Sequence, residues 1–404
     1  MKPAVACLAL ATIATLVTGP AAPAAAAPAA CPTPTAIPSD APAPVPPVDP
    51  AALAKTIGGL PAPDATAAIV RVGGGGSWQG VTGVADIATR RPASARVRFR
   101  AGSVTKMFTT AVVLQLVAEG RLSLDDTVQG RLPGLLPAGY PEIRVGQLLN
   151  HTSGLPTPDH PDGLEWVYQT RFRTWTPREF VAEAVRNPIE FRPGTRQHYL
   201  NINTFVAGLL IEKITGRSYE HEVTTRILRP LGMRDTYLPG VSPRIRGPHH
   251  QGYQTVPAGF PDAVPYQGGH VVNMTEMSVT STWASGDLIS TAADLETFIR
   301  ALFRGKVVPK ARLAPMFTVP AVPMYDPSGG CGAGPAVYTS GMARMELPNG
   351  VVVYGKTGAR YGYAAGVGAT RDLSRTLVYS VNSTDAKASG QNERTLRIAL
   401  AAFS

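Results

Sequence analysis

The stretch AGSVTKMFTTAVVLQLVAEGRL (101–122) decides how this chain folds. Its apolar residues recur at helical spacing and stop near a glycine, so it predicts a helix over residues 105–122. Ser103 and Lys106 stand three positions apart at the start of this helix. That spacing places both side chains on one helical face, within reach of each other.

A hydroxyl and an amine in this arrangement can act as a nucleophile and its base. The N-terminus of the helix presents a positive dipole end to a developing oxyanion. A lysine accepts a proton only where burial or a neighbouring cation lowers its pKa. Ser103 is the only serine that stands three positions before a lysine in this chain.

Two further motifs follow in order along the chain. Tyr199-Leu200-Asn201 is the only Tyr-x-Asn, and it precedes a helix expected over 205–216. Lys356-Thr357-Gly358 is the only Lys-Thr-Gly, and we expect it at the end of a strand over 351–355. Either motif alone could be a core tyrosine beside a helix or a strand ending in a turn. The three motifs together in this order point to one site.

Strand patterns occur at both ends of the sequence, with helical patterns between them. The turn Pro348-Asn349-Gly350 between two apolar runs predicts a hairpin. Strands at both ends predict an α/β (α+β) fold, with an antiparallel sheet built from both termini and helices inserted. The expected strands are 65–72, 80–88, 97–100, 342–358, 363–371 and 376–383, followed by a final helix over 392–402.

The three motifs resemble those of the penicillin-recognising serine hydrolases. Neighbouring phrases resemble the class C β-lactamase and D-alanyl-D-alanine carboxypeptidase branch, nearest to the secreted Streptomyces-type carboxypeptidases. These phrases are LLNHTSGLP (148–156), YLNINTFVAGLLIEKITG (199–216), PLGMRDT (230–236) and SGDLISTAADLETF (285–298). The resemblance implies a β-lactamase/transpeptidase-like fold, with an antiparallel sheet flanked by helices and a helical lobe.

The resemblance also implies roles for individual residues. Ser103 would be the acylated nucleophile, Lys106 its proton acceptor, and Tyr199 the relay of protons to and from the leaving group. The remaining implied contacts are with substrate. They involve Asn201 (substrate amide and lysine), Lys356 (positive potential near Tyr199), Thr357 (substrate carboxylate), Gly358 as part of the same motif, and Ala359, whose N–H would complete an oxyanion hole with that of Ser103.

Three more residues stay open as candidates. Trp283 could form a wall of the cleft or simply pack in the core. Arg344 or Arg360 could bind the terminal carboxylate of a substrate. Two departures from the family pattern put the substrate in doubt: Lys356 stands where the carboxypeptidases usually carry histidine, and Leu200 stands where the second motif usually has serine.

We expect the 404 residues to comprise a signal peptide, a linker and one hydrolase domain. Residues 51–404 would form the hydrolase, with a sheet lobe of 51–131 and 280–404 and a helical lobe of 132–279. Residues 1–30 have a positive start, a short apolar stretch and small residues, which predicts a signal peptide. Residues 31–50 form a proline-rich linker.

The N-terminus predicts a secreted protein that can associate with the cell envelope. Cys7 would leave with the signal, while Cys31 and Cys331 could pair in an oxidising compartment; Cys31 could instead be lipidated. The net charge is +10, and 30 of the 38 basic residues are arginines scattered without a run, so we expect no nucleic-acid partner. We expect no transmembrane segment and a monomer.

The function implied by the resemblance is acyl transfer through a covalent serine intermediate. A D-alanyl-D-alanine carboxypeptidase acting on peptidoglycan stem peptides is the favoured activity. A class C-like β-lactamase or an esterase uses the same motifs, and a penicillin- or peptidoglycan-binding module without turnover is the alternative of another class. No zinc motif, phosphate loop or dinucleotide fingerprint occurs, so we expect neither metal nor cofactor.

Overall fold

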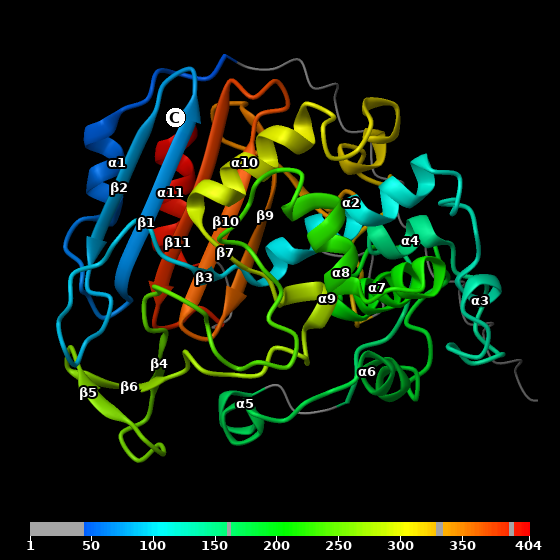
Figure 1. Ribbon diagram of the computed structural model, residues 1–404, viewed down its shortest axis with the longest axis horizontal. Helices are drawn as coiled ribbons and strands as arrows, with labels where there is room; N and C mark the ends of the chain where they lie inside the picture. The colour runs from blue at the N-terminus through cyan, green and yellow to red at the C-terminus, as the bar shows by residue number, and fades with distance from the viewer. Residues whose placement is uncertain (1–43, 160–162, 329–333, 388–391) are drawn as a thin grey trace, which may run out of the picture. The chain divides into compact units, whose positions relative to one another are not determined.

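The two ends of the described chain meet in one six-stranded antiparallel sheet (Figure 1). The computed structural model describes residues 44–159, 163–328, 334–387 and 392–404. The strand order is β2-β1-β11-β10-β9-β8. The strands are β1 (Ala65–Gly74), β2 (Trp78–Gly83), β8 (Ala343–Glu346), β9 (Val352–Arg360), β10 (Tyr363–Ala369) and β11 (Arg375–Ser383). The predicted fold class is therefore confirmed.

Helices cover both faces of this sheet. Helices α1 (Pro50–Ile57) and α11 (Glu393–Phe403) pack on one face, where their apolar residues join Val70, Leu377 and Val381 in one buried cluster. Helices α2 (Thr105–Ala118) and α10 (Ala292–Phe303) lie on the opposite side, in a second cluster. Because successive side chains of a strand point to opposite faces, the neighbours Leu377 and Val378 on β11 belong to different clusters.

The second cluster continues without a break from the sheet into the helical region. The helices of that region are α3 (Val128–Arg131), α4 (Val145–Leu149), α5 (Leu164–Thr170), α6 (Pro177–Ala184), α7 (Asn201–Thr215), α8 (Tyr219–Val223) and α9 (Trp283–Gly286). Short 3-10 turns occur at η1 (Gly102–Val104), η3 (Lys310–Arg312) and η4 (Ala314–Met316), and η2 (Thr224–Leu228) is a π-helical turn. The predicted division into two lobes stays a prediction, and one continuous core serves both.

Two small sheets lie outside the main one. Strands β3 (Phe99–Arg100) and β7 (Ile289–Ser290) form a pair. Strands β4 (Tyr253–Val256), β5 (Val264–Tyr266) and β6 (Gly269–Asn273) form a three-stranded sheet in the order β4-β6-β5. The sequence predicted only helices and loops in that region, because these strands are short and β5 contains a proline, which weakens a strand pattern.

The elements that carry the three motifs begin and end close to the predicted positions. Helix α7 starts at Asn201, four residues earlier than expected, and ends at Gly216, which adopts the left-handed conformation with φ 71°. Strand β9 continues through Lys356–Gly358 to Arg360, beyond the end expected at residue 355 and in agreement with the strand pattern over 342–358. This difference matters because the motif then lies on a hydrogen-bonded strand and not on a loop.

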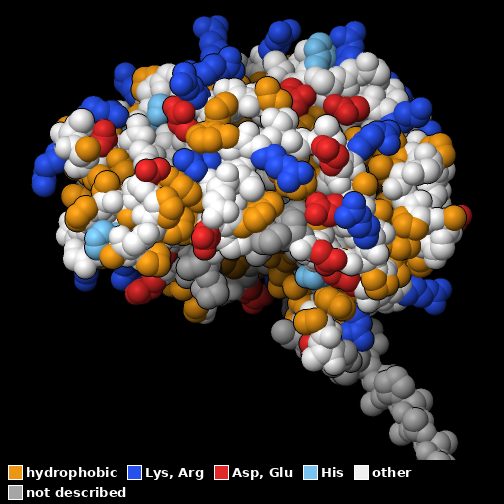
Figure 2. Space-filling model, turned by 90° about the horizontal axis from the view of Figure 1, so that it is seen from below, with side chains coloured by type: hydrophobic (Ala, Val, Ile, Leu, Met, Phe, Trp, Pro, Cys, Tyr) orange, Lys and Arg blue, Asp and Glu red, His pale blue; other side chains and the backbone are white. Residues whose placement is uncertain are grey.

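Several sequence-based expectations concern residues that the structure does not describe. The predicted signal peptide 1–30, most of the linker, Cys31 and Cys331 all lie outside the described residues. Within the described part of the chain, no helix is both long and apolar enough to cross a membrane. On the face seen in Figure 2, Lys and Arg side chains are spread among acidic and apolar ones and do not gather in one patch.

Candidate active site

Ser103 lies in the 3-10 turn that leads into α2. The residue before it, Gly102, has a positive φ of 53°, a conformation that favours glycine. A Cβ added at Gly102 would stand 2.7 Å from the backbone nitrogen of Ala359. The turn therefore depends on glycine for two reasons, and it brings the nucleophile's backbone against β9.

Lys106 is completely buried in the first turn of α2, and its amino group reaches three oxygen acceptors. Its Nζ donates to Ser103 Oγ at 3.2 Å, to Asn201 Oδ1 at 2.8 Å and to the backbone oxygen of Ser285 at 2.9 Å. Burial, with the nearby charge of Lys356, holds the pKa of Lys106 well below its usual value. A lysine with a lowered pKa can be neutral and can accept the serine proton.

Tyr199 stands beside this pair, immediately before α7. Its hydroxyl is buried and makes no hydrogen bond of ordinary geometry within the described residues, although Ser103 is close enough to act on its pKa. Burial outweighs that effect and raises the pKa of Tyr199, so the phenol is protonated at neutral pH. A protonated hydroxyl without a fixed partner next to the nucleophile is suited to passing protons.

Both lysines also lie against the ring of Tyr199. The Nζ of Lys106 is 4.9 Å and that of Lys356 is 4.6 Å from the ring centroid, distances at which a cation and an aromatic face attract. His151 and Tyr338 pack on the same ring, each with a centroid distance of 4.6 Å. The ring is thus held in place by contacts on several sides.

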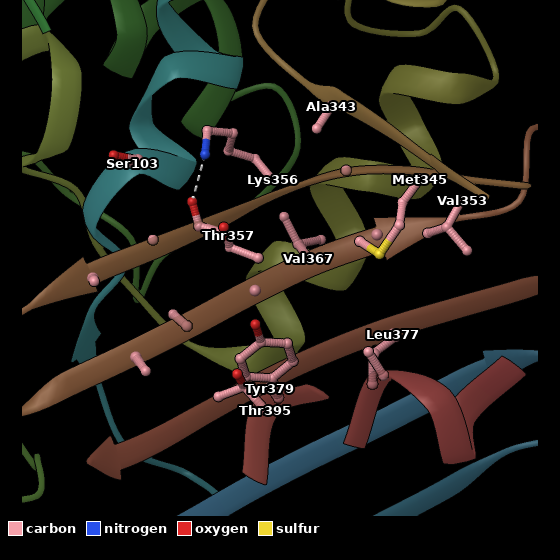
Figure 3. A pocket seen from close by; sticks show the side chains of 18 of the residues that line it. Ser103, Ala343, Met345, Val353, Lys356, Thr357, Val367, Leu377, Tyr379 and Thr395 are labelled. Carbon is pink, nitrogen blue, oxygen red and sulfur yellow. Dashed lines mark hydrogen bonds between the residues drawn. The ribbon is translucent and has the colours of Figure 1, made fainter. Parts of the chain in front are cut away.

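Lys356 and Thr357 present the third motif at the edge of β9 (Figure 3). The Nζ of Lys356 donates to the backbone oxygen of Thr357 at 2.9 Å, and burial lowers the pKa of this lysine to about 8. Thr357 is exposed, so its hydroxyl is available to a ligand. A cation and a hydroxyl next to each other suit a carboxylate group.

The backbone nitrogens of Ser103 and Ala359 come from two segments in direct contact. A Cβ added at Gly358 would lie 2.0 Å from the backbone oxygen of Ala101 and 2.7 Å from the nitrogen of Ser103. Only glycine fits there, and the close approach places the two N–H groups expected of an oxyanion hole on adjoining backbones.

Trp283 packs in the core and does not form a wall of the cleft. Its side chain is 6% exposed, and its indole nitrogen donates to Glu220 Oε1 at 2.9 Å. Its ring packs against Phe205 and Tyr219, with centroid distances of 5.8 and 5.2 Å. Trp283 is not among the residues that line the cavity at Ser103.

The two arginine candidates differ in position. Arg344 on β8 lines the cavity and pairs with Glu346 at 3.3 Å. Arg360 at the end of β9 is buried beside Met277, with 3.4 Å between its guanidinium and the sulfur, and burial lowers its pKa to about 10. Arg360 does not line the cavity, so Arg344 is the arginine within reach of a ligand there.

Two residues that contact Tyr199, His151 and Tyr338, are not among the site residues predicted from the sequence. His151 contacts the ring of Tyr199, and burial, with the charges of Lys106 and Lys356, keeps its pKa well below the usual value. The phrase around 148–156 carried a usable signal for it. Nothing in the sequence marked Tyr338, which comes from an irregular segment and meets the site only in three dimensions.

A cavity of about 580 Å³ opens at Ser103, Tyr199 and Lys356. Lys356 and Arg344 are the basic residues among those that line it, and no described lining residue is acidic. Among the described residues, no three His, Cys, Asp or Glu side chains gather in a way that could hold a metal ion. At its catalytic end, the cavity is lined by the reactive side chains of Ser103, Tyr199 and Lys356.

The sequence profile of the Beta-lactamase family matches residues 53–402, which include all three motifs. The chain belongs to the Beta-lactamase family. As a serine hydrolase of this family, it is similar to curated relatives and to solved structures with differing activities.

Two curated relatives of this Beta-lactamase family member match it over part of their length. Esterase EstB of Burkholderia gladioli is 33% identical over 202 residues, which cover 46% of this chain and 51% of the esterase. A putative D-alanyl-D-alanine carboxypeptidase of Escherichia coli is 29% identical over 154 residues, which cover 36% of this chain and 34% of that protein. The chain therefore spans about a third to a half of these relatives.

A solved structure matches this Beta-lactamase family member over nearly its whole length. The D-stereospecific amidohydrolase from Streptomyces sp. is 31% identical, with a TM-score of 0.73; the match covers 88% of this chain and 98% of that one. The family and the β-lactamase/transpeptidase-like fold expected from the motifs are confirmed.

Proposed function

We propose that this serine hydrolase removes a C-terminal D-amino acid from cell-wall stem peptides, as a D-alanyl-D-alanine carboxypeptidase does. The charge of the cavity carries the proposal: Lys356 and Arg344 line it, and no described lining residue is acidic. A peptide with a free carboxylate is attracted to such a site. The ammonium group of a free amino acid amide would meet no acidic side chain among the described residues that line the cavity.

Relatives support a D-configured peptide or amide as the substrate. One curated relative is named a putative D-alanyl-D-alanine carboxypeptidase, and one similar structure is that of a D-stereospecific amidohydrolase. Thr357 carries an exposed hydroxyl, and the Nζ of Lys356 lies against the backbone oxygen of the same residue, so these two groups would bind the terminal carboxylate.

The reaction begins with transfer of the Ser103 proton to neutral Lys106, whose Nζ stands 3.2 Å from the serine oxygen. The oxygen then bonds to the carbonyl carbon, and the negative charge moves to the carbonyl oxygen. The N–H groups of Ser103 and Ala359 stabilise that charge. Asn201 accepts a hydrogen bond from Lys106 and so holds the base in place.

The intermediate collapses when the C–N bond breaks and the leaving amine takes a proton. Tyr199 delivers this proton and recovers one from protonated Lys106, so that the acyl-enzyme forms with Lys106 neutral again. Water then attacks the ester carbon and gives its proton to Lys106. The bond between the acyl carbon and Ser103 Oγ breaks, and Ser103 Oγ takes that proton back. The products are a D-amino acid and a shortened peptide acid.

The proposal is tested by assaying the protein without residues 1–30 beside its Ser103→Ala variant. The substrates are a tripeptide ending in D-Ala-D-Ala, a chromogenic cephalosporin, a p-nitrophenyl ester and D-alanine amide. We expect release of D-Ala to dominate and Ser103→Ala to abolish it. Fast cephalosporin turnover without D-Ala release would establish a β-lactamase instead, and covalent labelling without turnover would establish a binding module.

An esterase is the second candidate, favoured by the 33% identity to Esterase EstB. Its substrate lacks the terminal carboxylate, so an esterase does not need the cation of Lys356. The variant Lys356→Met separates the two candidates: a carboxypeptidase loses peptide hydrolysis more than ester hydrolysis, whereas an esterase loses the two equally.

We also propose that the protein is exported, on the basis of the sequence of residues 1–30 alone. Expression of the full chain, followed by N-terminal sequencing of the protein in the medium and in the envelope fraction, tests this. A new N-terminus near residues 28–31 is expected. Retention of Met1 in the cytoplasmic fraction would overturn the proposal.

A further inference from the structure

The cavity at Ser103 extends beyond the catalytic residues, across the face of the sheet that carries α11. Strand register explains the hollow. Gly355 on β9 pairs with Gly368 on β10, and Gly368 pairs in turn with Leu377 on β11. Two neighbouring positions without side chains leave the face open between Val353 and Leu377.

Each of these glycines has its own surroundings. A Cβ added at Gly355 would come 2.2 Å from the backbone oxygen of Val367, so the strand pairing itself excludes a side chain there. A Cβ at Gly368 would contact only Val353 closely, at 3.0 Å. The space above Gly368 is therefore open to a group that enters from outside the sheet.

The walls of this hollow are apolar. Met345 and Val353 stand on one side, and Leu377 stands on the other (Figure 3). Helix α11 closes it with Ala399 and Phe403, which also line the cavity. We name the hollow bounded by these five residues the α11 groove. It is continuous with the cavity at Ser103 and has a lining suited to a hydrocarbon or aryl group.

The residues along the cavity indicate where each part of a bound substrate would lie. Ser103 marks the carbonyl under attack, and Thr357 marks the carboxylate on the leaving side. Gly355, two residues before Thr357 on the same face of β9, leads into the α11 groove. A substrate group that extends from Thr357 into the α11 groove is therefore part of the C-terminal residue, which departs when the peptide bond is broken.

We propose that the α11 groove binds a large apolar side chain on the C-terminal residue of the substrate. This inference rests on the proposed carboxypeptidase function and narrows it: the preferred leaving residue is a bulky apolar D-amino acid such as D-leucine or D-phenylalanine, rather than D-alanine. One additional methylene in an apolar pocket changes kcat/KM by about tenfold or more. Several methylenes therefore give a measurable preference.

The test compares N-acetylated peptides that end in D-Ala-D-Ala, D-Ala-D-Leu and D-Ala-D-Phe. Ala399→Phe fills the groove from the surface of α11 without touching the catalytic residues. Leu396→Phe adds bulk on the same helix at a position that is 37% exposed and does not line the cavity, so it is the matched control. Hydrolysis of the D-Ala-D-Ala peptide and the thermal unfolding midpoint report whether each variant folds.

We expect the unmodified protein to cleave the D-Leu and D-Phe peptides at least about tenfold faster in kcat/KM than the D-Ala peptide. Ala399→Phe should remove that preference and leave D-Ala release within about twofold, while Leu396→Phe should change neither. A preference for D-Ala in the unmodified protein, or an equal effect of Ala399→Phe on all three peptides, overturns the inference and leaves the proposed function standing.

Failure of the proposed function has a different signature. If none of the three peptides is cleaved but D-alanine amides are, the carboxypeptidase proposal fails. The same variants are then compared on D-alanine methylamide and D-alanine benzylamide. Loss of benzylamide cleavage confined to Ala399→Phe supports an apolar leaving-group site, and equal rates in all three proteins reject it.

Discussion

The two ends of the cavity are built on opposite principles, although the same strand forms part of both. At the catalytic end, Lys106 is buried and each of its hydrogen bonds has a specific oxygen acceptor. In the α11 groove, the floor has no side chains and the walls are apolar. Strand β9 serves both ends because its residues alternate: Tyr354 belongs to the core on the α2 side, and Val353 to the core on the α11 side.

This contrast shows where the molecule tolerates change. A buried, charged cluster depends on every partner, since an unpaired buried polar group costs about 1–3 kcal/mol. The walls of the α11 groove belong to the apolar core on the α11 side and carry no group that takes part in the chemistry, so substitutions that fill the groove should alter which substrates fit more than how the chemistry proceeds. The same kind of substitution should therefore have very different effects at the two ends.

The largest effect is expected from Lys106→Met, which keeps the length of the side chain and removes the base. The loss in kcat should reach about 10³-fold, because general-base catalysis contributes 10²–10⁴-fold. Steady-state hydrolysis of a peptide and an ester measures it, beside Lys213→Met, an exposed lysine on α7. A Lys106→Met enzyme with more than a tenth of the original activity would contradict the assignment of the base.

Gly358→Ala should have the next largest effect, because its Cβ would overlap the backbone of Ala101 and Ser103. We expect about a 10²-fold loss in kcat from a displaced oxyanion hole, together with a lower thermal unfolding midpoint. Circular dichroism during heating and acyl-enzyme formation followed by mass spectrometry provide the two measurements. Full activity in this variant would place the oxyanion elsewhere.

The pH dependence distinguishes substrates with and without a carboxylate. Lys356 has a pKa of about 8, so its positive charge is present below that pH and is lost above it. For a peptide acid, kcat/KM should fall about tenfold per unit above pH 8, while an uncharged ester shows no such fall. At lower pH both rates should decline as Lys106 becomes protonated. Parallel profiles for both substrates at high pH would exclude Lys356 as the carboxylate partner.

The smallest effect is expected from Gly368→Ala, which is the counterpart of Gly358→Ala in the groove. Its Cβ would lie 3.0 Å from a methyl group of Val353 and at least 3.6 Å from any backbone atom of another strand, so the overlap is much smaller than at Gly358. Release of D-alanine should stay within about twofold, and only the larger leaving residues should be affected. The comparison between the two glycine variants fails if Gly368→Ala reduces D-alanine release as strongly as Gly358→Ala does.

Much of this arrangement could be predicted from local sequence patterns. The helix after Ser103, the hairpin at Pro348-Asn349-Gly350 and the sheet formed from both ends each have a strong pattern of apolar spacing or turn residues. The grouping of Ser103, Lys106 and Tyr199 followed from the motifs, because a motif specifies residues that act together even when they lie far apart in the chain.

The rest could not be predicted, because it depends on contacts that leave no local trace. Tyr338 stacks on Tyr199, and the backbone oxygen of Ser285 accepts a hydrogen bond from Lys106. No sequence spacing or composition predicts either contact. The open floor at Gly355 and Gly368 requires the strand register, which pairs two glycines that separately look like ordinary strand residues.

The pairing of β1 with β11 sets the order in which this enzyme can become active during its synthesis. Strand β9, which carries Lys356, pairs with β8 and β10, but only β10 and β11 connect it to β1, so the sheet cannot be completed until almost the whole chain has been made. Lys106 and its acceptor Ser285 are already 179 positions apart. Contacts of such long range form late and slowly. A chain made only as far as β8 therefore contains its nucleophile but has no working site, and hydrolytic activity begins only after β9, β10 and β11 have been added.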